Sequence, residues 1–117
     1  MGDAQPVPAL DEVDEVFQAL ADPTRRAVIE RLGRGPAATT ELARPFAMAL
    51  PSFTQHLAVL ERCGLVRSHK AGRVRTYHLE RTRLDVAEQW MASQRATWER
   101  RLDQLDDYLY DLKEQHP

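Results

Sequence analysis

The chain has 117 residues, 43% of them apolar, and a net charge of −2, which fits a single folded domain of modest core rather than a disordered segment. Its one cysteine, Cys63, excludes an internal disulfide, and we predict neither a signal peptide nor a membrane span, so a cytoplasmic protein is expected. Residues 23–79 hold ten Lys or Arg against three Glu, whereas both ends are net acidic, which indicates either a basic surface for phosphates or an ordinary mixed-charge surface.

Two helices are predicted in the first third of the chain. Residues 1–10 contain two prolines and little apolar periodicity, so we expect a loose tail there. Residues 11–21 carry apolar side chains at helical spacing. Asp22 and Pro23 are typical of the cap and first turn of a second helix, and Gly33 is typical of its end.

Two short helices are predicted next. The first runs from about residue 40 to 47 with Thr39 as a plausible cap, and Pro45 within it must shorten or bend it. The second covers residues 51–63 and has one apolar and one polar side. Ala49, just before it, offers no side-chain acceptor, so its N-terminal cap is weak.

The remaining third predicts a hairpin and a long helix. Residues 65–79 alternate in their second half, with Ala71-Gly72 between two basic arms, which is typical of a β-hairpin. Residues 82–113 carry an apolar stripe with one skip, as in a coiled coil. Because this stripe is too long for so small a domain to bury, we expect pairing with a second chain; the alternative is packing within the monomer.

This order of elements predicts a mainly α fold with a small two-stranded β-hairpin, in which a helix-turn-helix is followed by a wing. The second short helix of such a unit lies in the DNA major groove, and the arginines around the wing turn touch phosphate or enter the minor groove. The candidate DNA-binding residues are Thr40, Pro51, Ser52, Thr54, Gln55, His56, Lys70, Arg73 and Arg75.

The sequence resembles the ArsR-type winged-helix repressors over roughly residues 12–112. The resemblance is carried by LADPTRRAVIERLGRGPAATTELARPF, by PSFTQHLAVLERCGLV and by GRVRTYHL, although Ala49 and Gln55 depart from the family pattern. It implies a cytoplasmic homodimer that binds an imperfect palindrome, represses transcription and dimerises through its first and last helices. The expected interface residues are Val13, Val16, Phe17, Trp90, Met91, Trp98, Leu102, Leu105, Leu109 and Leu112.

Metal sensing, which is common in this family, is not predicted. Relatives use cysteine pairs in the third helix or His and carboxylate clusters on the last one, but TTELARPFA lacks Cys and His, and the last helix lacks His before His116. We therefore expect no metal and no cofactor. Cys63 is interpreted as a packed residue at a helix end, with a single-thiol sensor as the alternative.

Three further alternatives stay open at this point. His56 either forms structural hydrogen bonds or contacts DNA. Trp90 and Trp98 either fill the dimer core or line a pocket for an organic effector. Finally, no nucleophile–base spacing or phosphate-binding glycine loop suggests an enzyme, so the competing function is a winged-helix module that binds a partner protein.

Overall fold

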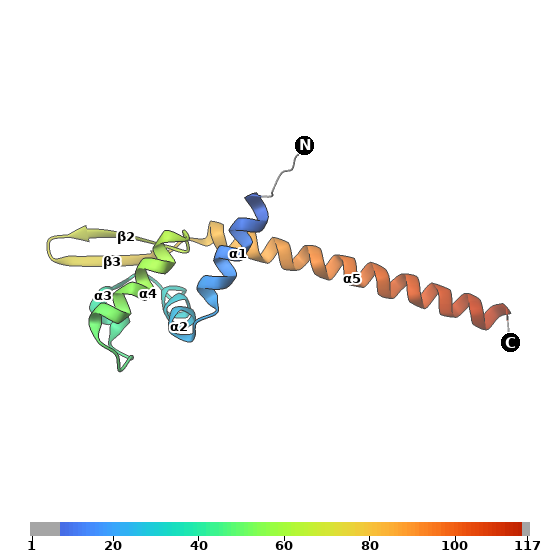
Figure 1. Ribbon diagram of the computed structural model, residues 1–117, viewed down its shortest axis with the longest axis horizontal. Coiled ribbons are helices and arrows are strands. Elements are labelled where there is room, and N and C mark those ends of the chain that lie inside the picture. The colour runs from blue at the N-terminus through green and yellow to red at the C-terminus, as the bar shows by residue number, and fades with distance from the viewer. Residues whose placement is uncertain (1–7, 116–117) are drawn as a thin grey trace. The chain divides into compact units, whose positions relative to one another are not determined.

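The computed structural model describes residues 8–115 and divides into two compact units, which meet after Ala87 in the sequence. Along the chain the elements are α1, α2, β1, α3, α4, β2, β3 and α5 (Figure 1). Helix α1 spans Pro8–Leu20 and so begins three residues before the predicted start, within the expected tail. The rest of that tail, residues 1–7, lies outside the described residues.

Helix α2, Pro23–Leu32, has the predicted ends. The Asp22 carboxylate accepts a hydrogen bond from the backbone N–H of Arg25 at 3.0 Å, and Pro23 occupies the first turn, where a missing N–H costs nothing. At the other end, the N–H of Gly33 donates to the carbonyl of Ile29 at 2.9 Å. Both predicted boundaries of this helix are therefore confirmed.

The segment before α4 differs from the prediction. A short strand, β1, covers Ala37–Ala38, and α3 follows at once over Thr39–Ala43. Thr39 is the first helical residue rather than the cap, and the Glu41 carboxylate instead accepts from the backbone N–H of Ala38 at 2.8 Å. The helix is short, as the proline at position 45 predicted.

Helix α4, Leu50–Arg62, follows the weak N-terminal cap that Ala49 predicted. After Cys63 the chain changes direction at Gly64, whose φ of +81° lies in the left-handed region that glycine adopts without strain. Space is also restricted there, because a Cβ atom at position 64 would lie 3.0 Å from the Arg83 side chain. Both features explain why α4 ends at a glycine.

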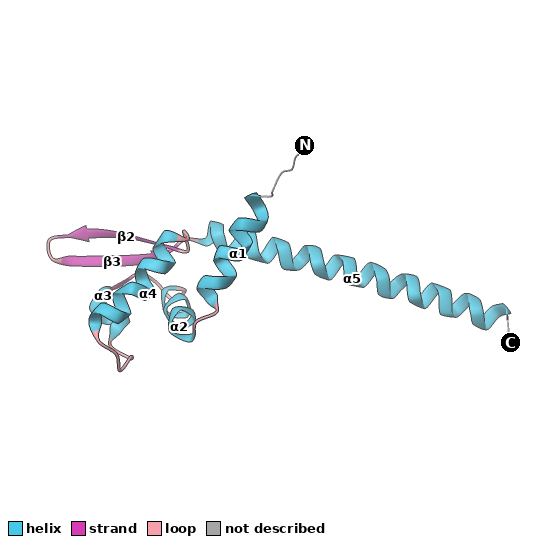
Figure 2. Ribbon diagram, in the orientation of Figure 1, coloured by secondary structure: helices cyan, strands magenta, loops and turns pink. Residues whose placement is uncertain are grey.

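The sheet has three antiparallel strands in the order β1-β3-β2, not the two that were predicted. Figure 2 shows the two longer strands, β2 and β3, side by side. Strands β2, Val66–Ala71, and β3, Val74–Leu79, form the hairpin, and β1 pairs with the outer side of β3. Ala71 pairs with Val74, so the turn consists of Gly72 and Arg73 rather than Ala71-Gly72. The φ of +64° at Gly72 explains the glycine there.

A continuous apolar core joins the elements of the first unit. It includes the inward side of α4, and Phe53 on that side lies 5.3 Å from the ring of Phe46. The core residues without exposed surface are Val16, Phe53, Leu57, Leu60, Leu65 and Val66. Burial on this scale, roughly 1.5–3 kcal/mol for each large side chain, positions α4 firmly.

Two residues of the predicted dimer interface lie in this interior instead. Val16 has no exposed surface and Val13 is only 5% exposed, so they have almost no area to offer a second chain. Residues three positions apart lie on the same face of a helix, and the face of α1 that carries these two valines packs within the protomer. Phe17, on the same helix, is half-buried and packs against the core.

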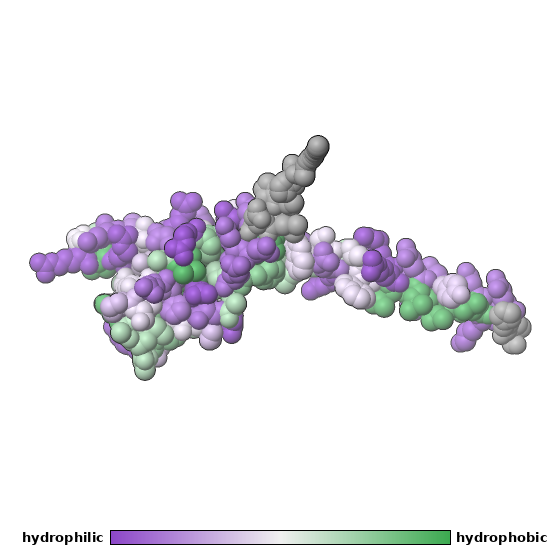
Figure 3. Space-filling model, in the orientation of Figure 1, coloured by the Kyte–Doolittle hydropathy of each residue, from purple (hydrophilic) through white to green (hydrophobic). Residues whose placement is uncertain are grey.

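Helix α5 spans Arg81–Gln115, close to the predicted 82–113. Its residues after Ala87 form the second unit, along which apolar side chains gather on one side of the helix (Figure 3). The exposed large apolar residues of this unit are Trp90, Met91, Trp98, Leu102, Leu105, Tyr108, Leu109, Tyr110 and Leu112. No helix among the described residues has the length and hydropathy of a membrane span.

Candidate nucleic-acid interface

Helices α3 and α4 and the β2-β3 hairpin form one side of the first unit (Figure 1). A tight connection of residues 44–49 links the two helices, and α4 packs against β2. Strand β1 lies directly before α3 and pairs with β3, so the sheet joins the hairpin to the helix-turn-helix. The predicted DNA-binding residues come from these neighbouring elements.

The first turns of α4 present polar side chains to solvent. Ser52, Gln55 and Pro51 are exposed, and so is Thr40 on α3. Thr54 is only half exposed, and its hydroxyl donates to the carbonyl of Pro51 at 3.0 Å. Ser52 and Gln55 are therefore the exposed α4 residues of the predicted set whose polar side chains can turn to an external ligand.

His56 lies on the other edge of α4 and contacts α2. Its Nδ1 atom is 3.2 Å from a guanidinium nitrogen of Arg25 and 3.7 Å from the Asp22 carboxylate. Arg25 can only donate, so Nδ1 is the acceptor when the imidazole is neutral. Of the two interpretations of His56, the structure favours the hydrogen-bonding one, and its predicted contact with DNA has no support from this geometry.

Arg25 was not predicted as a functional residue, yet it connects three helices. Besides contacting His56 on α4, its Nε atom donates to the carbonyl of Ala19 at 2.7 Å and a terminal nitrogen donates to that of Gln18 at 3.1 Å. These carbonyls lie in the last turn of α1, at the negative end of the helix dipole, so a cation there is favourable. The sequence signal that could have identified Arg25 is its position just after the Asp22 cap, which directly follows the end of α1.

Asp22 is the acidic member of this group. Burial opposes the ionisation of its carboxyl, but the backbone N–H of Arg25 and the electrostatic attraction of His56 and Arg25 prevail and lower its pKa below the usual value. Asp22 is thus a carboxylate at neutral pH. It caps α2 and neutralises part of the positive charge behind α4.

The hairpin presents its basic side chains in a compact group. Lys70 and Arg75 are paired across β2 and β3, and Arg73 lies in the turn; all three are exposed. Like charges on directly opposed residues repel each other, so this arrangement destabilises the free hairpin. An anionic ligand would remove that repulsion.

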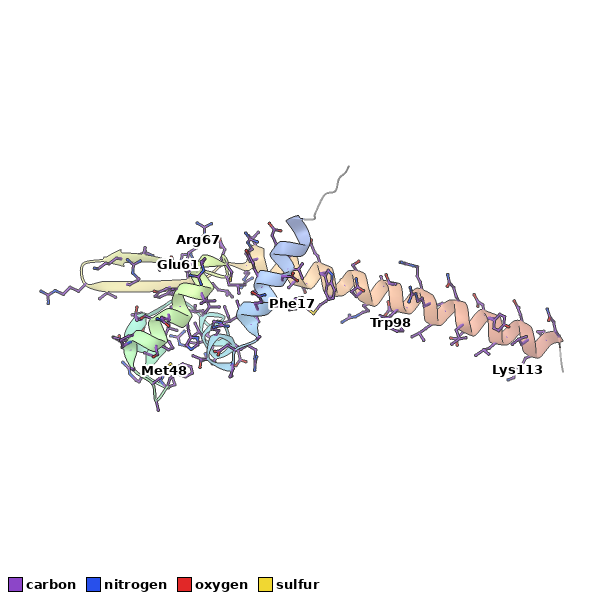
Figure 4. The ribbon with its side chains drawn as sticks, viewed as in Figure 1. Phe17, Met48, Glu61, Arg67, Trp98 and Lys113 are labelled. Atoms are coloured by element: carbon purple, nitrogen blue, oxygen red, sulfur yellow. The ribbon has the colours of Figure 1, made fainter. Side chains whose placement is uncertain are left out.

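Two residues that the sequence did not single out hold Arg75 in place. A terminal nitrogen of Arg75 donates to the Ser68 hydroxyl at 2.9 Å, and that hydroxyl in turn donates to the Glu61 carboxylate at 2.9 Å. Figure 4 shows Glu61 on the side of α4 near the hairpin. Burial, helped by the charge of Glu61, raises the pKa of the neighbouring Tyr77 phenol. This chain of contacts connects the hairpin to α4.

Arg67 at the base of the hairpin differs from the other basic residues. Its guanidinium lies 3.2 Å from the Glu80 carboxylate, although 70% of its side chain is exposed. The neighbouring carboxylate balances its charge. The net positive potential of the hairpin therefore comes from its turn and outer half.

Cys63 is packed at the end of α4, in agreement with its interpretation as a packed residue at a helix end. Its side chain is 8% exposed, and Sγ donates to the carbonyl of Leu60 at 3.4 Å. Burial raises the pKa of the thiol, which keeps the reactive thiolate scarce. Among the described residues, no group of three or more His, Cys, Asp or Glu lies close enough together to hold a metal ion.

Comparison with known proteins agrees with this geometry. Residues 20–69 match a family model described as a helix-turn-helix domain. The chain is 49% identical over 71 residues to the HTH-type transcriptional regulator Rv2034 of Mycobacterium tuberculosis, covering 61% of this chain and 66% of Rv2034. It is 32% identical to the transcriptional repressor SdpR of Bacillus subtilis over 68% of this chain and 88% of SdpR.

Solved structures extend the similarity to more than four fifths of the chain. The crystal structure of an ArsR family transcriptional regulator is 52% identical and superposes with a TM-score of 0.75, covering 83% of this chain and 97% of that one. A homodimeric winged helix-turn-helix DNA-binding domain from Mycobacterium bovis is 27% identical with a TM-score of 0.61, covering 86% of this chain and 93% of that domain.

Proposed function

Because the chain belongs to the ArsR family of transcriptional regulators, we propose that it is a homodimeric repressor that binds a specific site on double-stranded DNA in the cytoplasm. The observation that carries this proposal is the exposed polar start of α4 beside an exposed basic hairpin, both fixed to the same core. The relatives are named as regulators and repressors, not as enzymes.

In this proposal α4 lies in the major groove and the hairpin follows the backbone. Ser52 and Gln55 meet base edges, because their side chains are exposed and polar. Arg73 and Lys70 meet phosphates, where a flexible cation needs no fixed geometry. Arg75 also contacts phosphate, in an orientation that Ser68 supports.

The dimer forms through the second unit. Its apolar stripe would remain in water in a single chain, where Trp98 is 62% and Leu102 is 55% exposed. A homodimer brings two α4 helices to two half-sites, so the operator is an imperfect palindrome with half-sites about one helical turn apart. The homodimeric relative from Mycobacterium bovis supports the stoichiometry.

The test is selection of binding sites from random DNA duplexes by the purified protein without added metal. We expect enrichment of a two-fold symmetric sequence. A matched control is the Gln55→Ala/Ser52→Ala variant, which should bind DNA with little enrichment, because both residues are exposed and their loss leaves the core intact. Failure to enrich any sequence, with a folded dimeric protein, would favour the protein-interaction module instead.

A further inference from the structure

A cavity of about 480 Å³ in the first unit is lined by residues of α2, of α3 and of the connection that follows α3. The apolar part of its lining includes Val28 and Leu42, which are buried, and Phe46, which is half-buried. Ligand cavities in proteins have volumes of roughly 300–1,000 Å³ and combine apolar walls with a few polar groups. The volume and the lining of this cavity therefore suit a small organic molecule.

Three arginines give this cavity a positive charge. Arg31 and Arg34 come from the end of α2 and the residues after it, and Arg44 comes from the connection after α3. Glu41 is the acidic residue of the lining, so three positive charges and one negative charge leave the lining at +2. Among the described residues none of the three arginines forms an ion pair with a carboxylate, and Glu41 accepts a hydrogen bond from the backbone N–H of Ala38. The charge of the cavity therefore favours an anionic ligand.

Arg31 is held in position beside the apolar part of the lining. One of its terminal nitrogens donates to the carbonyl of Gly35 at 3.0 Å, and its side chain is half-buried. A guanidinium has several further N–H donors in a planar fork, which matches the two oxygens of a carboxylate. The chemistry of the cavity thus combines a site for a carboxylate with an apolar surface for the rest of the molecule.

We propose that this cavity binds a small organic carboxylate, whose charged end meets the three arginines and whose apolar part lies against Phe46. Phe46 also packs against Phe53 of α4, with the ring centroids 5.3 Å apart, so the ligand contacts the connection that leads into α4. The regulatory part of this inference rests on the proposed function: the bound negative charge lies on the unit that meets DNA, so the ligand lowers the affinity for the operator.

Titration of the purified protein with cinnamate, without DNA, tests the site directly. We expect saturable binding in calorimetry, with shifts of the Leu42 and Phe46 backbone amides in NMR spectra. Cinnamamide, which has the same apolar part but no charge, should bind on the order of tenfold more weakly. Arg44→Gln should weaken cinnamate binding by a similar factor, because it removes one exposed arginine from the lining. Arg62→Gln, the matched control, removes an exposed arginine outside this cavity and should leave binding unchanged.

Three results of this titration would overturn the site. The first is the absence of saturable binding up to millimolar cinnamate. The second is equal binding of cinnamate and cinnamamide, or equal losses in the two arginine variants. The third is a set of NMR shifts confined to the exposed apolar side of α5, which would place the probe on that surface instead.

Operator binding supplies a second readout and separates this proposal from the proposed function. Saturating cinnamate should weaken the affinity of the wild type for an operator duplex on the order of tenfold, and Arg44→Gln should need about tenfold more cinnamate for the same effect. If the operator is bound but cinnamate has no effect on its affinity, the regulatory inference is wrong and the proposed function stands. If Arg44→Gln lowers operator affinity and cinnamate does not bind, the arginines contact phosphates instead. Cinnamate binding to a protein that selects no DNA sequence would keep the site and refute the proposed function.

Discussion

The turn of the hairpin allows a quantitative test of DNA contact. Arg73 is exposed in the Gly72-Arg73 turn, so Arg73→Ala should remove one phosphate contact from each wing and two from the dimer without disturbing the core. Each lost contact reduces the slope of log K against log salt by about 0.9, giving a total of about 1.8. Over a fourfold rise in salt, the affinity advantage of the wild type should therefore shrink by about tenfold.

Arg67→Ala is the matched control for this measurement. It removes the same charge from the same hairpin, but Glu80 at 3.2 Å already balances that charge. We would measure the dissociation constants of the three proteins for one operator duplex by fluorescence anisotropy at several salt concentrations. Equal slopes for the wild type and Arg73→Ala, or equal losses for both variants, would refute the assignment of the hairpin turn to phosphate.

Three other predictions concern single residues. Gln55→Ala should reduce discrimination by roughly 1–3 kcal/mol at one base pair per half-site, measured with operator variants; a uniform loss on all sequences would assign Gln55 to phosphate. Asp22→Ala should lower the free energy of unfolding by about 1 kcal/mol at pH 7. The pKa of Asp22 is lower in the folded protein than the value of about 3.9 in the unfolded chain, so its charge stabilises the fold at pH values above about 3.9. This charge-dependent stabilisation is lost as the pH falls through the pKa of the folded state. The difference in unfolding free energy between the wild type and Asp22→Ala, measured by urea denaturation, should therefore shrink in acid. A difference that does not change with pH would contradict this. Finally, iodoacetamide should alkylate Cys63 slowly in the folded protein and rapidly in urea, and equal rates would disprove its burial.

Local signals in the sequence predicted the helices well. The ends of α2 follow from Asp22, Pro23 and Gly33, because capping depends on side chains within a few residues. The long stripe of α5 was equally clear, since many turns repeat the same pattern. These features require no knowledge of distant partners.

Features that depend on distant residues were missed. Strand β1 consists of two alanines, which carry no periodicity, and it exists because β3 offers backbone partners nearly 40 positions later in the chain. The contact of Arg25 with His56 joins α2 to α4 across 31 positions of the sequence, so no local pattern reveals it. Val16 was assigned to an interface because an apolar helix face alone does not reveal whether a core or a second chain covers it.

The pairing of β1 with β3 has a consequence for how such a protein diverges. Backbone hydrogen bonds help to set the spacing between the hairpin and the start of α3, because Ala37 and Ala38 align with Tyr77 and Thr76 through the main chain. Substitutions on the exposed faces of α4 and the hairpin therefore leave that spacing intact. In the proposed function, a lineage can exchange the side chains that contact DNA, and so acquire a new operator, while the frame that holds them keeps its dimensions.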